Sequence, residues 1–280
     1  MGTSTRNSGQ SGHNPLIPTW IKDDLLASKQ EETQPSGIAN PHPDFPQTPI
    51  PSEGDPNRFR GPRASFTHYT SGGGRNSALM RKGISNYIGQ SLGGSKNATI
   101  RLGSSRGSTA RLYRVLHTLS GSGGLQKIAR FLSLDTLKGL TASDFFIRLA
   151  DFVCPDGGSE DEGIARSAYY DVVADNPEIM QKPTESLSKE EIDSVLQKYM
   201  SKVVMQQVMN GIANKAISFT ESLEKISHIE DVVEQFISQS VSDACAHVKQ
   251  ENITMTNERA REITDTIYHN VFEILEGTGD

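Results

Sequence analysis

The stretch from residue 57 to residue 134 contains no aspartate and no glutamate, although it carries thirteen lysine and arginine residues. Residues 135–280 have the opposite composition, with 27 of the 34 acidic residues of the chain and only 12 basic ones. The formal net charge of -6 conceals this division. A positive segment of this length needs a negative counterpart. The candidates are nucleic acid, an acidic partner surface and the acidic part of the protein itself.

Other absences narrow the class of protein. Two cysteines, Cys154 and Cys245, are too few for a disulfide framework, and their apolar surroundings predict reduced, buried thiols. No apolar run approaches the ~20 residues of a membrane span. The N-terminus lacks the basic-then-apolar pattern of a secretory signal. We therefore expect a cytoplasmic protein that has no membrane contact.

The first 57 residues contain few core-forming side chains and predict a long disordered arm that is rich in glycine, serine and proline. Residues 1–14 have little that packs. An apolar cluster near 16–26 has helical spacing, but so short a helix is marginal in water, so it is expected to dock on this protein's core or on a partner. Seven prolines between residues 34 and 56 predict an extended linker.

From residue 58 onward, apolar residues recur at helical spacing and no alternating strand pattern is convincing. Helix starts are indicated by three pairs that resemble capping boxes, namely Thr141 with Asp144, Ser188 with Glu191 and Ser227 with Glu230. The closing helix is expected to end at Gly277. The chain therefore predicts an all-α fold with three regions: a flexible arm (1–57), a basic glycine-rich helical segment (58–134) and an acidic helical domain (135–280).

The sequence contains no convincing catalytic signature. The histidines and cysteines lack metal-ligand spacing, and no nucleophile elbow with a triad is present. Gly89–Asn97 is similar to a phosphate-binding loop, but Ser95 separates Gly94 from Lys96, Asn97 replaces the required Ser or Thr, and no strand precedes it. We expect a flexible basic turn there, and a protein that is not an enzyme and needs neither metal nor cofactor.

The basic segment contains a weak internal repeat in which a tyrosine precedes a glycine-rich basic turn. Tyr69 is followed by Gly72–Asn76, and Tyr87 by Gly93–Asn97, which suggests a duplicated hairpin. The arginines are candidates for phosphate contacts, and Phe66, Tyr69 and Tyr87 are candidates for stacking on bases. The alternative is a helical hairpin whose positive face packs against an acidic partner or against the acidic half of the chain.

The N-terminus offers a second candidate for chemistry. The initiator methionine before a glycine is normally removed, which leaves the Gly2 amine on an open, flexible tail. The pKa of an α-amino group lies close enough to neutrality for a useful fraction to be unprotonated and nucleophilic. Read by chemistry alone, such a start is more commonly dispensable.

Several stretches together resemble the QatB family, a component of the bacterial Qat anti-phage defence operon. They are the Met1–Ser4 start with the glycine and serine tract after it, Pro15–Trp20, the proline linker, Arg58–Arg63 and the two tyrosine-then-glycine units. The pattern covers residues 1 to about 120, and the helical remainder is compatible with it. The resemblance implies that catalysis belongs to neighbouring proteins: a KAP-type P-loop ATPase, a QueC-like enzyme and a TatD-like nuclease.

The resemblance further implies a role for the arm. QueC-like enzymes use ATP to activate a 7-deazaguanine carboxylate, and Gly2 is the expected acceptor of that acyl group, with Thr3 and Ser4 small enough to enter the active site. The residues expected to contact partners are Thr3, Ser4, Trp20, Ile21, Leu25, Arg58, Phe59, Arg60, Arg63, Tyr69, Arg75, Tyr87, Lys96 and Arg101. Two alternatives remain: an adaptor that brings phage nucleic acid to the nuclease, and a scaffold for the ATPase.

Overall fold

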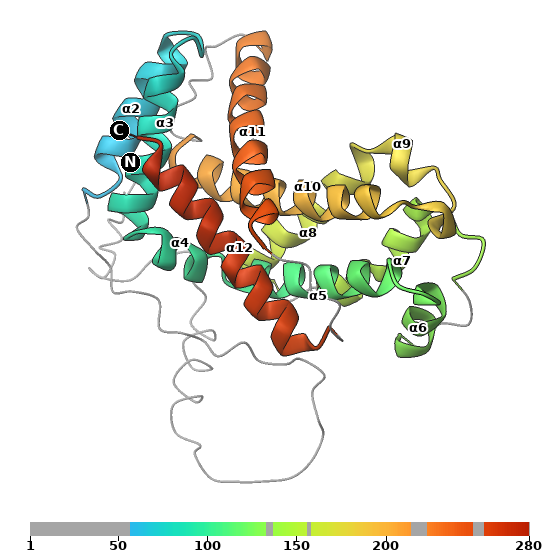
Figure 1. Cartoon of the computed structure of the whole chain (residues 1–280). Helices are drawn as coiled ribbons and strands as arrows, with labels where there is room; N and C mark the ends of the chain where they lie inside the picture. The colour runs from blue at the N-terminus through green and yellow to red at the C-terminus, as the bar shows by residue number, and fades with distance from the viewer. Residues whose placement is uncertain (1–56, 133–136, 156–157, 214–222, 249–254, 280) are drawn as a thin grey trace, which may run out of the picture. The chain divides into compact units, whose positions relative to one another are not determined.

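The computed structural model describes residues 57–132, 137–155, 158–213, 223–248 and 255–279. All of them fall within one compact unit, Phe45–Asp280. Within these ranges the regular structure is helical, apart from an isolated β-bridge between Thr141 and Pro183 (Figure 1). This confirms the predicted all-α fold. The predicted arm, with its 16–26 segment and proline linker, lies outside the described residues.

The helical elements are numbered in their order along the chain. They are α2 (Arg60–Ser71), α3 (Ser77–Asn86), the π-helix η1 (Tyr87–Leu92), α4 (Ser95–Arg101), α5 (Ser104–Leu119), α6 (Gly124–Phe131), α7 (Ala142–Val153), α8 (Glu160–Ala174), α9 (Pro177–Met180), the 3-10 helix η2 (Thr184–Ser186), α10 (Lys189–Val208), the π-helix η3 (Met209–Ala213), α11 (Leu223–Ala246) and α12 (Asn257–Gly277).

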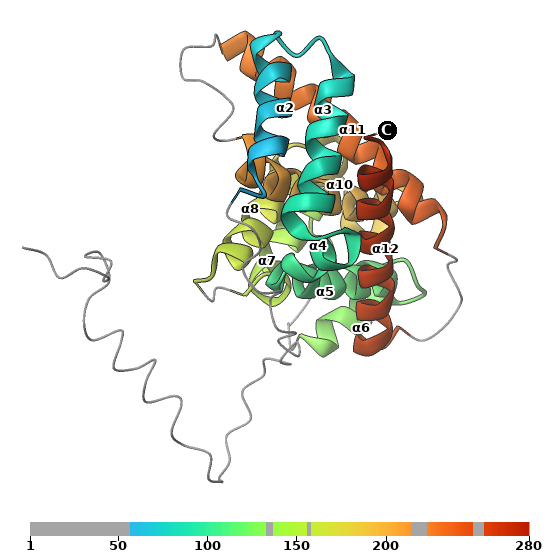
Figure 2. The same cartoon turned by 90° about the vertical axis from the view of Figure 1, so that its left-hand side faces the viewer.

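The basic and acidic parts of the sequence share one core. Helix α12 packs against α4 and α5 from the basic segment and against α11 from the acidic one, and α10 packs against α5, α8 and α11 (Figures 1 and 2). Phe66 and Tyr87 from the basic segment belong to the same buried cluster as Tyr199 and Tyr268. Burial of this apolar area is the main stabilising contribution, and neither part of the sequence provides it alone.

Two helices begin with full capping boxes. The Ser188 hydroxyl accepts from the Glu191 amide, and the Glu191 carboxylate accepts from the Ser188 amide at the start of α10, as the sequence predicts. Ser159 and Glu162 form the same arrangement at the start of α8, which the sequence analysis did not identify. Each cap satisfies amide groups that have no partner within the helix.

The other predicted starts need correction. The Thr141 hydroxyl does cap α7 by accepting from the Asp144 amide, but the Asp144 carboxylate accepts from that hydroxyl and does not complete a capping box. Helix α11 already includes Leu223, so Ser227 lies inside it and does not begin it. The last helix ends at Gly277, as predicted.

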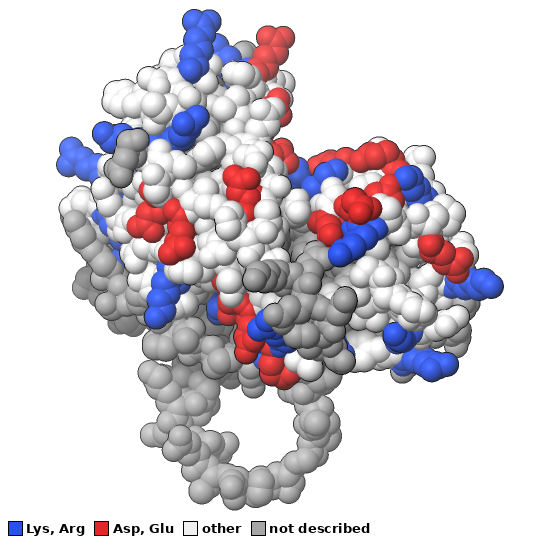
Figure 3. Space-filling model, viewed as in Figure 1, with Lys and Arg blue, Asp and Glu red and all other residues white. Residues whose placement is uncertain are grey.

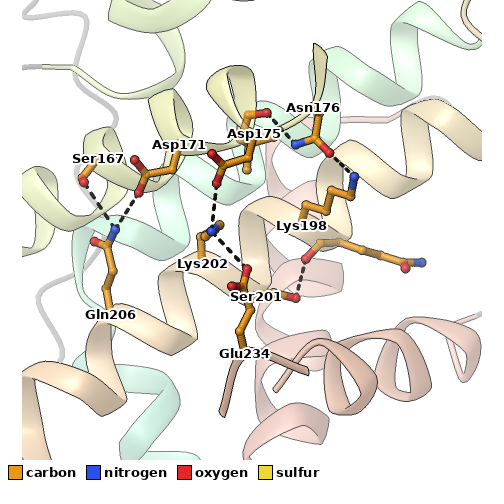
Figure 4. Close-up of polar contacts among 11 residues, drawn as sticks. Ser167, Asp171, Asp175, Asn176, Lys198, Ser201, Lys202, Gln206 and Glu234 are labelled. Carbon is orange, nitrogen blue, oxygen red and sulfur yellow. Dashed lines mark hydrogen bonds and ion pairs between the residues drawn. The ribbon is translucent and has the colours of Figure 1, made fainter. Parts of the chain in front are cut away.

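A polar seam along α10 holds α8 and α11 against it (Figure 4). The Lys202 ammonium lies 3.0 Å from a carboxylate oxygen of Asp175, just after α8, and 3.0 Å from one of Glu234 on α11. One turn further on, the Gln206 amide donates to Asp171 at 3.2 Å and to Ser167 at 3.3 Å. Part of the acidic charge of the chain therefore connects its own helices.

Both cysteines are free, as expected, with Cys154 buried and Cys245 partly buried. Burial raises the pKa of both thiols, that of Cys245 to about 12. Both groups therefore stay protonated at neutral pH and act as small apolar side chains of the core.

Candidate partner-binding surface

The arginines of helix α5 bond to the acidic part of the chain. The Arg106 guanidinium forms an ion pair with Asp265 on α12 at 3.2 Å. Arg111 donates to the Val153 carbonyl at the end of α7, at 2.9 Å, and Arg114 donates to the Asn257 side chain at 2.6 Å. The alternative in which the basic segment packs against the acidic half of the same chain is therefore realised for this helix.

The glycine turn before α4 is filled by an acidic side chain of the chain itself. The Ser95 amide, in the first turn of α4, donates to the Glu276 carboxylate of α12 at 2.9 Å. Gly94 has a φ of 93°, a conformation that side-chain-bearing residues rarely adopt, and it brings the backbone close to that carboxylate. The segment that is similar to a phosphate-binding loop therefore holds a carboxylate from α12 at its helix start.

Five other basic residues project from α2, α3 and α4 and the turns between them: Arg60, Arg75, Arg81, Lys82 and Lys96. We call them the basic surface. Each is exposed, and none forms an ion pair with a carboxylate of the described residues. In Figure 3, blue side chains project from the part of the molecule that α2 and α3 form in Figure 1. This surface is a candidate for contact with a negatively charged partner.

Three further arginines belong to the neighbourhood of a pair of aromatic rings: Arg58 and Arg63 lie over Phe59, and the charge of Arg101 acts on Tyr87. We call them the arginine cluster. The Arg58 and Arg63 guanidinium carbons lie 5.1 and 4.7 Å from the Phe59 ring centroid, and the Phe59 and Tyr87 centroids are 6.2 Å apart. Burial raises the pKa of Tyr87 to about 12, and the positive charges of Arg101 and Arg63 act in the opposite direction.

One arginine of the cluster, Arg63, is held by η3, and the neighbouring Tyr87 is held by the end of α10. Both Nε and a terminal nitrogen of Arg63 donate to the Gly211 carbonyl, at 3.3 and 3.2 Å. The Tyr87 hydroxyl donates to the Gln207 carbonyl at 3.2 Å. A Cβ on Gly211 would lie 2.3 Å from the Tyr87 ring, so the close approach of the two π-helices requires glycine at this position. Short π-helical turns such as η1 and η3 are frequent at functional sites.

The aromatic residues proposed to stack on bases lie in the core. Phe66 and Tyr69 have an exposed fraction of 0%, and Tyr87 has 2%. Their rings are therefore not available on the surface of the described structure, although Tyr69 and Tyr87 stand among the expected partner contacts. A buried helix face also carries aromatic residues, so the sequence pattern alone does not separate the two roles.

The remaining predicted contacts lie outside the described residues: Gly2, Thr3, Ser4, Trp20, Ile21 and Leu25. The structure brings together Arg58, Phe59 and Arg63, and the charge of Arg101 acts on the adjacent Tyr87. It leaves Arg60, Arg75 and Lys96 exposed on the basic surface.

The part of the chain that the structure describes offers no group of metal-ligating side chains. None of its helices combines the length and the apolarity that a membrane crossing requires. A cavity between α5 and α10, beside His117 and Asp193, has a volume of about 30 Å³, enough for a single water molecule. A cavity of this size has no room for a substrate.

The comparison with protein families agrees with the resemblance noted from the sequence. Residues 93–275 match the model of the family described as Qat anti-phage system associated protein QatB. Residues 1–92, which carry most of that resemblance, lie outside the match. No curated protein and no solved structure matches the chain. Since the match covers more than half of the sequence, the chain belongs to the QatB family of the Qat anti-phage system.

Proposed function

We propose that this protein is a non-enzymatic component of the Qat system that binds the QueC-like partner enzyme and presents its Gly2 amine for conjugation to a 7-deazaguanine. The basic surface and the arm make the contact with that partner. The family description supports the coarser part of this proposal, because it names an associated protein and no reaction.

The observation that carries the proposal is an exposed basic surface next to the point where the arm joins the helical unit. Arg60 is exposed and lies three residues after Asn57, where the described chain begins. Residues 57–134 contain no acidic residue. A partner held on this surface is therefore close to the attachment point of residues 1–56. Binding there raises the effective concentration of the N-terminus at the active site of the partner.

The conjugation step is an acyl transfer. The unprotonated Gly2 amine attacks the carbonyl carbon of the ATP-activated 7-deazaguanine carboxylate. An amide C–N bond forms, the C–O bond to the nucleotide leaving group breaks, and the amine proton passes to a base of the partner or to water. The partner supplies the activation, so this chain contributes the nucleophile and its delivery.

The test is the intact mass and the N-terminal peptide spectrum of the protein after co-expression with the QueC-like enzyme. We expect a mass increase on Gly2 that matches the acyl-deazaguanine and is absent without the enzyme. A Gly2→Pro variant replaces the primary amine and should lose the increase. Arg60→Glu with Arg75→Glu keeps the amine but should weaken the association and reduce the modified fraction.

An unmodified N-terminus on a protein that still co-purifies with the enzyme would contradict conjugation and leave only the binding role. A normal modified fraction in the Arg60→Glu, Arg75→Glu variant would contradict the role of the basic surface, while leaving the arm as the recognised element.

The same five exposed cations favour a second candidate, an adaptor for nucleic acid that serves the TatD-like nuclease. If phosphate contacts carry the binding, the affinity should fall steeply with salt. The logarithm of the association constant then falls linearly with the logarithm of the salt concentration, with a slope proportional to the number of phosphate contacts. A salt titration of oligonucleotide binding separates the candidates, because only the adaptor needs useful affinity near physiological salt. With Phe66, Tyr69 and Tyr87 buried, such binding would rest on phosphate contacts rather than on stacking by these rings.

A further inference from the structure

The arginine cluster differs from the basic surface in its surroundings. Arg58, Arg63 and Arg101 are partly buried, and two of them stack on the same ring, that of Phe59. Arg63 is committed to the Gly211 carbonyl. The Nε atoms of Arg58 and Arg101 are buried, and neither has a hydrogen-bond partner. These donors are therefore withdrawn from water without a replacement acceptor.

The charges of the cluster also lack a counterion within the described residues. No carboxylate forms an ion pair with any of the three guanidinium groups. The negative charge of Glu160 acts on the neighbouring Tyr87, but its effect on the pKa of that residue is smaller than those of Arg101 and Arg63. Like charges that are partly withdrawn from water repel one another, and a buried donor without an acceptor adds a further cost.

An anion bound at the cluster offsets the repulsion between its charges, and a buried polar group without a partner can mark the neighbourhood of an ion. A carboxylate offers one negative charge and two acceptor atoms, which suits a single guanidinium. Three guanidinium groups supply three positive charges and up to fifteen N–H donors, some of which Arg63 already gives to Gly211. A phosphate group, with close to two negative charges and at least three acceptor oxygens, matches this set better.

We propose that Arg58, Arg63 and Arg101 form a binding site for a phosphate group, either free phosphate or the phosphate of a mononucleotide. Tyr87 is buried, and two guanidinium groups lie over the Phe59 ring, so these rings do not offer a base a stacking surface. The site therefore recognises the phosphate and is indifferent to the base. It depends neither on Gly2 nor on the QueC-like partner.

The test is calorimetric titration of the purified full chain with inorganic phosphate, in a chloride buffer at constant ionic strength. Adenosine and guanosine monophosphates are titrated in parallel. We expect saturable binding of all three, with affinities for the two nucleotides within about threefold of each other. In the Arg58→Gln, Arg101→Gln variant, which leaves the Arg63 contact to Gly211 in place, the dissociation constant should rise at least about tenfold.

The matched control is Arg75→Gln with Lys82→Gln, which removes the same charge from exposed positions outside the cluster and should change the phosphate affinity less than about twofold. Equal weakening in both variants would overturn the site in favour of diffuse attraction. Absence of binding to the wild-type chain, or binding only of oligonucleotides, would also overturn it. Circular dichroism confirms that each variant is folded. Should the glutamine variant not fold, Arg58→Lys with Arg101→Lys keeps the charge and should still weaken binding, because lysine lacks the two-pronged donor.

Discussion

The Ser95 amide donates to the Glu276 carboxylate across 181 positions of the sequence. This bond joins the first turn of α4, in the acid-free segment, to the last turn of α12. It places a negative charge at the positive end of a helix dipole, where α4 has no side-chain cap of its own. The separation of charge along the sequence is thus partly resolved by folding, because α12 brings Glu276 and Asp265 to the basic helices.

Replacing Glu276 by glutamine should destabilise the fold by about 1 kcal/mol, the usual worth of a capping carboxylate at a helix start. The side chain keeps its length but loses the charge that faces the Ser95 amide. Urea unfolding followed by circular dichroism measures the change. The control is Glu273→Gln on the same helix, where the side chain is 59% exposed and pairs with His269 one turn earlier, so the expected loss is at most a few tenths of a kcal/mol. Equal losses in the two variants would contradict the capping role.

Two glycine-to-alanine substitutions should act in opposite directions. At Gly211 the new methyl group would lie 2.3 Å from the buried Tyr87 ring, which has no room to move, so we expect a loss of about 2–3 kcal/mol. Gly163 lies on the exposed side of α8 with no atom within 4 Å of a Cβ, so alanine there should stabilise by about 0.5–1 kcal/mol. Thermal unfolding of both variants checks the pair. A stable Gly211→Ala protein would mean that the contact between the two π-helices is looser than described.

The salt links of Lys202 should show measurable coupling. Burial alone lowers the pKa of Lys202, but hydrogen bonds to Glu234 and Asp175 outweigh it, and the net pKa lies above 10.5. The resulting stability is fully present below the ordinary lysine pKa and is lost only as the pH rises through the raised value, so it is constant between pH 6 and 9. A double-mutant cycle of Lys202→Gln and Glu234→Gln should give a coupling of about 0.5–1 kcal/mol.

That coupling should fall when the cycle is repeated in about 1 M salt, since the side chain of Glu234 is 40% exposed and open to screening. The same cycle with Lys198 in place of Lys202 is the control, because no ion pair joins Lys198 to Glu234. A coupling that is the same for both lysines would show that the measured term is general electrostatics and not the polar seam.

The sequence predicts the helices much better than their contacts. Ser188 and Glu191 are three positions apart, so their cap is readable locally, as is the end of the last helix at Gly277. Glu276 and Gly211 have no local signal, because their partners lie more than a hundred residues away. The aromatic residues show the same limit. Tyr69 and Tyr87 follow a pattern that suits both a binding surface and a buried helix face, and only the packing of α2, α3 and η1 decides between them.

The acidic cluster at the start of α8 sets up a competition at Asp161. A Cβ on Gly103 would lie 2.0 Å from the Asp161 carboxylate, so this group sits where α5 begins, and the dipole of that helix favours its charge. Burial, followed by the negative charges of Glu160 and Glu162, nevertheless raises the pKa of Asp161 above 3.8. Folding therefore favours the protonated form of Asp161. This contribution to the stability of the fold is fully present below the ordinary pKa of aspartate and is lost as the pH rises through the raised pKa.

Asp161→Asn should consequently be more stable than the wild-type protein at pH 7, with a difference that shrinks as the pH approaches 4. Urea unfolding of both proteins at pH 4, 5, 6 and 7 measures this trend, and Asp231→Asn, on the exposed face of α11, corrects for the loss of one negative charge from an acidic protein. If asparagine were instead the less stable residue at pH 7, the attraction between the start of α5 and the carboxylate would outweigh burial and repulsion. The charge of Asp161 would then stabilise the junction between the basic and acidic parts of the chain.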